Sequence, residues 1–126
     1  MWRLNLTLDD DLLPVQYFFN SIPYDLFMQI MESFSKGIGA GFESCSCDFP
    51  GDLDAWEEPI NGIMFTLGDE EVIIPYDKFL EILELSVNTF IESHENKKDE
   101  ALSVLEKVKI YIYEDISNAL PGDNVI

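Results

Sequence analysis

Apolar residues recur at helical spacing in two segments of the chain. In the first, residues 24–34, the apolar positions are Phe27, Ile30, Met31 and Phe34, beginning after Pro23. In the second, residues 77–93, they are Phe79, Leu83, Val87 and Phe90, with Leu80 and Ile91 widening the stripe. Apolar residues every three or four positions form one face of a helix. Both segments are therefore predicted to be amphipathic helices, with Pro23 in the first turn of the earlier one.

Two short apolar runs between these helices have the composition of strands. Residues 62–67 and 72–74 are rich in branched and aromatic side chains, and Gly68, Asp69, Glu70 and Glu71 separate them. This arrangement predicts a hairpin with residues 68–71 as its connection. Residues 42–49, after three closely spaced glycines, are predicted to be irregular or strand-like.

The last helix is predicted over residues 99–119, although part of it has a second interpretation. Its inward positions are Ala101, Leu105, Val108, Ile112 and Ile116. Residues 107–113 also alternate as a strand does, but no Gly, Pro or Asn separates them from the preceding helical segment. The sequence therefore predicts an α+β fold: a small antiparallel β-sheet or hairpin packed with about three α-helices, in a single domain over residues 1–126. Residues 121–126 are predicted to be a short tail.

The charge of the chain is strongly one-sided. Its 126 residues include 25 carboxylates and 7 Lys or Arg, for a formal net charge of −18. Apolar residues make up 47%, so this is a folding chain and not a disordered acidic tail. Nucleic acids and anionic membranes are unsuitable partners because binding phosphates requires clustered cations. The charge favours a partner with a positive surface. Such a partner would relieve the repulsion among the carboxylates of this chain, and the electric field of the chain would steer it into contact.

The acidic loop at residues 48–58 has three interpretations. Its carboxylates could bind a hard cation, but Pro50 and Leu53 occupy positions where a calcium-binding EF-hand loop needs a ligand and a glycine. Catalysis by paired carboxylates is disfavoured because no pair is singled out, so no enzymatic activity, metal or cofactor is predicted. The third interpretation is a contact surface for a basic protein, formed with the hairpin connection. Its candidate residues are Asp52, Asp54, Trp56, Glu57, Glu58, Asp69, Glu70 and Glu71.

The remaining chemical groups indicate structure more than function. Cys45 and Cys47 are too close in sequence for a stabilising disulfide, and one distant histidine, His94, does not complete a zinc site. His94 is predicted to cap a helix C-terminus, and the aromatic run at residues 17–19 to be core. With no secretory signal and no apolar run of the ~18–20 residues that span a bilayer, the protein is predicted to be cytoplasmic, with reduced thiols.

The segment from Asn61 to about Val108 resembles the immunity proteins of bacterial contact-dependent growth inhibition systems, particularly those paired with ribonuclease toxins. The resemblance rests on the strand with Gly62 and Phe65, the acidic connection, the strand at residues 72–74, and the two helices that follow. It implies a cytoplasmic protein that binds one cognate toxin domain and covers its active site or its substrate path. The alternative from the residues is a divalent-cation-responsive regulatory domain that uses the acidic loop at residues 48–58. A nucleic-acid mimic or a chaperone for a basic effector would share the same surface properties.

Overall fold

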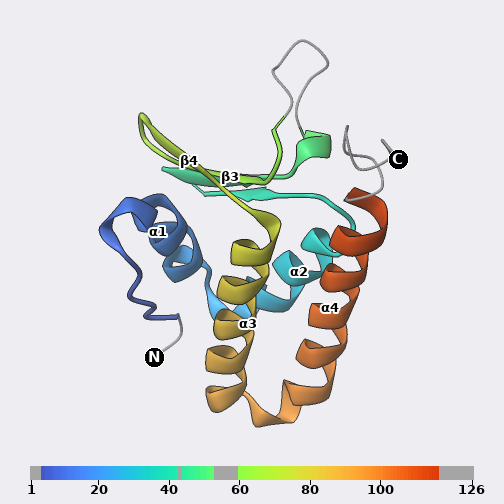
Figure 1. Cartoon of the computed structure of the whole chain (residues 1–126). Coiled ribbons are helices and arrows are strands. Elements are labelled where there is room, and N and C mark those ends of the chain that lie inside the picture. Colours follow the sequence, from blue (N-terminus) through green and yellow to red (C-terminus); the bar gives the residue numbers. More distant parts are fainter. Residues whose placement is uncertain (1–3, 43, 53–59, 117–126) are drawn as a thin grey trace.

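The computed structural model describes residues 4–42, 44–52 and 60–116 of the chain. Four α-helices and a four-stranded antiparallel sheet form within these residues, which confirms the predicted α+β class (Figure 1). The helices are α1 (Leu13–Ser21), α2 (Tyr24–Phe34), α3 (Tyr76–Ser93) and α4 (Lys98–Ile110), and the strands are β1 (Ala40–Gly41), β2 (Cys45–Asp48), β3 (Ile63–Leu67) and β4 (Glu70–Ile74). Short 3-10 turns lie at η1 (Asp10–Leu12), η2 (Pro50–Asp52) and η3 (Glu95–Lys97), and α4 continues as a π-helical segment, η4 (Tyr111–Ile116). The predicted tail at residues 121–126 lies outside the described residues.

The four strands lie in the sheet in chain order, each antiparallel to the next. Phe65 of β3 pairs with Cys47 of β2 on one side and with Val72 of β4 on the other, and Ile63 pairs with Ile74. Because side chains alternate along a strand, these residues share one face of the sheet. Helix α1 packs against that face, and in Figure 1 the four helices all lie on the same side of the sheet.

The core between the sheet and the helices is built largely from phenylalanine rings. Phe18 of α1 lies 5.5 Å from Phe65 of β3, measured between ring centroids. Phe79 of α3 lies 5.7 Å from Phe34, 5.6 Å from Phe49 and 6.3 Å from Phe65. All five rings are fully buried, so they connect the sheet to three helices in one apolar cluster.

Helix α1 is not among the helices predicted from the sequence, although its signal is present. In this segment the buried residues after Pro14 are Val15, Phe18, Phe19 and Ile22, a spacing that fits one helical face. The exposed Tyr17 inside the aromatic run obscures this pattern, and Pro14 is tolerated because it lies in the first turn. The position predicted for Pro23 was wrong by one residue: it precedes the first turn of α2.

The C-terminal helical prediction is confirmed over the described residues, with a change of helix type. Residues 98–110 are α-helical and residues 111–116 are π-helical, so the strand interpretation of residues 107–113 was wrong. Its alternation is broken by Ile110, which is 48% exposed, whereas Val108 and Ile112 are fully buried. The buried residues follow the helical period instead.

His94 ends α3 as predicted. It occupies the C-cap position, with Nδ1 3.1 Å from the carbonyl oxygen of Phe90 and its ring stacked on the Phe90 ring at 4.2 Å. The carbonyl can only accept, so Nδ1 donates to it in the tautomer that carries the proton there; Ser93 Oγ also lies 2.9 Å from Nδ1. The Ser93 hydroxyl, at 3.3 Å, and the imidazole thus both contact a carbonyl at the helix end, where backbone carbonyls lack helical partners.

Candidate functional site

The acidic connection of the hairpin is shorter than predicted. Gly68 and Asp69 form the turn, whereas Glu70 and Glu71 belong to β4, where Glu70 pairs with Leu67. Gly68 has a φ of +60°, and every non-glycine residue in the described part has a negative φ. A glycine with positive φ followed by a residue with negative φ fits a type II′ turn, whose twist matches a two-residue hairpin. The two glutamates are therefore held by strand pairing, and not by a flexible loop.

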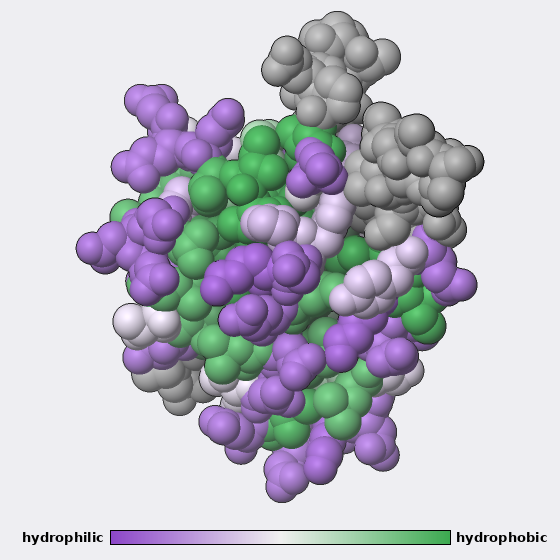
Figure 2. All heavy atoms as spheres, viewed as in Figure 1, coloured by the Kyte–Doolittle hydropathy of each residue, from purple (hydrophilic) through white to green (hydrophobic). Residues whose placement is uncertain are grey.

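The two glutamates point to opposite faces of the sheet. Glu70 shares the helix-covered face with Leu67, and Glu71 shares the outer face with Thr66, its cross-strand partner. Ile73 lies on the same outer face and is 46% exposed. Both glutamates and Asp69 are exposed, so the hairpin end presents three carboxylates to solvent. In Figure 2 this end projects as a hydrophilic group at the upper left.

Asp52 differs from the three hairpin carboxylates because its side chain holds the backbone. Its Oδ2 atom accepts hydrogen bonds from the backbone N–H groups of Gly39 and Phe49, both at 2.8 Å. It follows the C-terminal end of β2, which the antiparallel register places at the opposite end of the sheet from the hairpin turn. A five-residue strand is roughly 13 Å long. Asp52 and the hairpin carboxylates therefore do not form one cluster.

The other candidates in the acidic loop lie outside the described residues; these are Asp54, Trp56, Glu57 and Glu58. They remain predictions. The described residues contain no group of three His, Cys, Asp or Glu side chains that could hold a metal ion.

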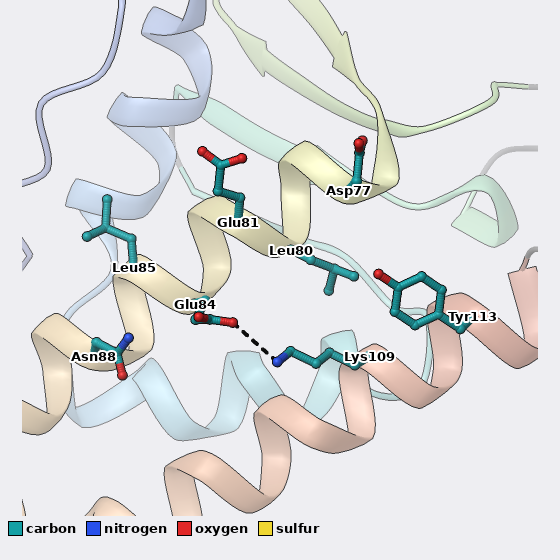
Figure 3. A pocket seen from close by; sticks show the side chains of 8 residues that line it. All are labelled: Asp77, Leu80, Glu81, Glu84, Leu85, Asn88, Lys109 and Tyr113. Carbon is teal, nitrogen blue, oxygen red and sulfur yellow. Dashed lines mark ion pairs between the residues drawn. The ribbon is translucent and has the colours of Figure 1, made fainter.

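A groove between α3 and the α4–η4 helix was not predicted from the sequence. Its volume is about 640 Å³, within the ~300–1,000 Å³ typical of ligand sites. It is lined by Asp77, Leu80, Glu81, Glu84, Leu85, Asn88, Lys109 and Tyr113 (Figure 3). We call this the α3–α4 groove. The signal that could have found it is the spacing of residues 77, 81, 84, 85 and 88, which lie on one solvent-facing stripe of α3.

The lining of the α3–α4 groove combines carboxylates with exposed apolar surface. An ion pair of 3.2 Å between Lys109 Nζ and Glu84 Oε2 crosses it from α4 to α3. Leu85 is 47% exposed and Tyr113 is 61% exposed, which leaves a large aromatic ring in solvent. In Figure 3 the Tyr113 hydroxyl points toward Leu80 and the first turns of α3.

Both cysteines are free and buried in the structure. Burial raises the pKa of both thiols, and the neighbouring carboxylates of Asp48 and Asp52 raise that of Cys47 further. An unfolded chain loses thiol protons near pH ~8.5, before the folded protein does. The contribution of the protonated thiols to the free energy of unfolding is therefore fully present below that pH. Above it, the free energy of unfolding falls by at most about 1.4 kcal/mol per pH unit for each thiol.

We expect the midpoint of urea unfolding to decrease between pH 7.5 and 9.5, and to decrease less in Cys47→Ala. The folded protein should also react slowly with iodoacetamide at pH 7.5. Rapid alkylation of both thiols without unfolding would contradict their burial.

Comparison with known proteins identifies the family. The model of the CDI immunity protein family, where CDI denotes contact-dependent growth inhibition, matches residues 10–105, well over half of the chain. The chain belongs to the CDI immunity protein family. This match confirms the predicted family. Proteins of this family neutralise a cognate toxin, so the partner of this chain is a toxin. Among curated proteins, none matches the chain.

The matched region includes most of the surfaces described above. It contains the hairpin end, Asp52 and the α3 side of the α3–α4 groove, whereas Lys109 and Tyr113 lie beyond its last residue. None of the described helices is both long and apolar enough to cross a bilayer.

Proposed function

We propose that this CDI immunity protein acts in the cytoplasm by binding the basic ribonuclease domain of its cognate toxin and covering the active site or the substrate path. The observation that carries the proposal is the net charge of −18 on a member of this family. A ribonuclease holds a phosphate backbone, which requires a positive cleft. An acidic protein is complementary to such a cleft, whereas it is repelled by nucleic acid itself. In this proposal the protein is an inhibitor without enzymatic activity.

The arrangement of the carboxylates supports fast capture. The three at the hairpin end are exposed, and α3 adds the exposed carboxylates of Asp77, Glu81 and Glu84. The field of such a surface can raise the association rate constant to ~10⁸–10⁹ M⁻¹s⁻¹ at low salt. Speed matters because each toxin molecule acts catalytically until it is bound.

The first test is capture of the partner. The full-length protein, immobilised at low salt, should retain one stoichiometric basic domain from lysate of the native host, and a salt gradient should release it. The released domain should degrade RNA, and adding the immunity protein back should stop the degradation. Recovery of a toxin with another activity would overturn the ribonuclease assignment. Retention of many unrelated basic proteins, all of which elute at moderate salt, would show that the charge acts without specificity.

A second prediction concerns the hairpin end. The double variant Glu70→Lys, Glu71→Lys should associate with the recovered toxin more slowly, on the order of threefold or more, because it reverses exposed charge that steers the encounter. The dissociation rate should change less. Stopped-flow kinetics at two salt concentrations measures both. The control is Glu95→Lys in η3, an exposed reversal at the end of α3 far from the sheet. Equal rates for the double variant and wild type would remove the hairpin from the contact surface.

A further inference from the structure

We infer that the α3–α4 groove receives an arginine- or lysine-bearing segment of the toxin. This inference rests on the proposed function and names a binding site for the toxin beyond the residues predicted from the sequence. Its grounds are the shape of the groove, its charge and the exposed aromatic ring at its end.

One wall of the groove carries negative charge. Asp77, Glu81 and Glu84 are exposed and lie three or four residues apart along α3, so their carboxylates line the same side of the helix. Lys109 is the single cation among the lining residues, and its ion pair with Glu84 offsets one of the three charges. Lys78 is not a lining residue, but its Nζ lies 3.6 Å from Glu81 Oε1 and offsets part of a second charge. The groove therefore keeps a net negative charge that a cation would satisfy.

The rest of the lining suits the aliphatic part of a basic side chain. Leu80 is 6% exposed and lies at the base of the groove, while Leu85 leaves about half of its side chain uncovered. Arginine and lysine bury their methylene groups against apolar surface while their charged ends reach carboxylates. A groove lined by leucines beside carboxylates fits this shape better than it fits a small anion, a nucleic acid or a purely apolar peptide.

Tyr113 gives the groove an aromatic end. It lies in the π-helical segment η4, which continues α4. Its 61% exposure is the largest among the exposed apolar side chains of the described residues. A guanidinium lying over this ring would gain a cation–π contact, and tyrosine is enriched among the residues that dominate binding energy.

Two variants test the inference with the toxin domain recovered in the capture experiment. Tyr113→Ala should raise the Kd by about 10- to 100-fold, mainly through faster dissociation. Glu81→Lys should lower the association rate constant and reduce its dependence on salt. The control for Tyr113→Ala is Tyr17→Ala on α1, which removes a tyrosine that is 46% exposed. The control for Glu81→Lys is Glu32→Lys on α2, which reverses an exposed charge. Circular dichroism and urea unfolding verify that all four variants fold.

The outcomes separate this inference from the proposed function. If wild type binds the toxin and both groove variants bind it as the controls do, the groove is not the site, and the proposed function stands. If wild type binds no basic nuclease, the proposed function fails and the inference with it. A concentration-dependent dimer of the free protein that Tyr113→Ala abolishes would also overturn the inference, because a second copy of this chain would then fill the groove.

Discussion

Replacing Phe79 by alanine should lower the free energy of unfolding by about 3–5 kcal/mol, the usual cost of removing a buried phenylalanine. Its ring is fully buried and contacts three other rings, from α2, from the segment after β2, and from β3. No single neighbour can move into the space because each is held by a different element. The total stability of a domain is about 5–15 kcal/mol, so the loss should be a large fraction of it.

Urea unfolding followed by circular dichroism measures this loss. Phe79→Leu is the matched variant, because it keeps most of the apolar volume and should cost about 1.5 kcal/mol or less. Leu102→Ala on α4, where the side chain is 39% exposed, should change stability little. A Phe79→Ala variant as stable as Phe79→Leu would mean that the aromatic cluster collapses around the cavity, contrary to the packing described.

Gly39→Ala should destabilise the protein by about 3 kcal/mol or more, although it adds a single methyl group. A Cβ at this position would overlap the backbone carbonyl oxygen of Cys47 and crowd Oδ2 of Asp52. A strand backbone cannot give way as a flexible side chain does, so β1 and β2 would have to separate. The hydrogen bond from the Gly39 N–H to the Asp52 carboxylate would be lost with them, which leaves a charged acceptor with one partner fewer.

Gly51→Ala is the control for this prediction. A Cβ at Gly51 meets no atom within 4 Å and its φ is not positive, so alanine should be tolerated. Thermal unfolding of both variants, with amide exchange of Gly39 and Phe49 as the local measurement, tests the effect. Rapid exchange at both amides in an otherwise stable Asp52→Ala variant would show that the Asp52 carboxylate protects these two N–H groups. Equal melting temperatures for the two glycine variants would contradict the predicted clash at Gly39.

The fold was predictable wherever one element buries one stripe of its own residues. Helices α2 and α3 each bury the residues that the helical period singles out, and the hairpin strands bury Ile63, Phe65 and Ile74. Helix α1 escaped prediction because an exposed tyrosine stands inside its aromatic run. The strand-like alternation near Ile110 was misleading because a partly solvated helix can place an apolar residue in water.

The binding surface was less predictable because it depends on how elements are placed relative to one another. The walls of the α3–α4 groove come from segments more than twenty residues apart, and its acidic stripe looks in sequence like any solvated helix face. The role of Asp52 depends on two backbone N–H groups brought together by the turn after β2 and by the chain before β1. Neither the groove nor the pair of N–H groups at Asp52 can be predicted from the pattern of residue types.

The orientation of Glu70 and Glu71 has a consequence for the direction from which the toxin arrives. A rigid strand directs one carboxylate toward the helical layer and the next toward the opposite face of the sheet, so a partner approaching from one side meets one of them first. Reversing each glutamate alone therefore compares the two sides of the same hairpin. A toxin that docks in the α3–α4 groove and one that lies over the outer sheet face should respond differently to these two single substitutions, and the pair reports the orientation of the complex before its structure is solved.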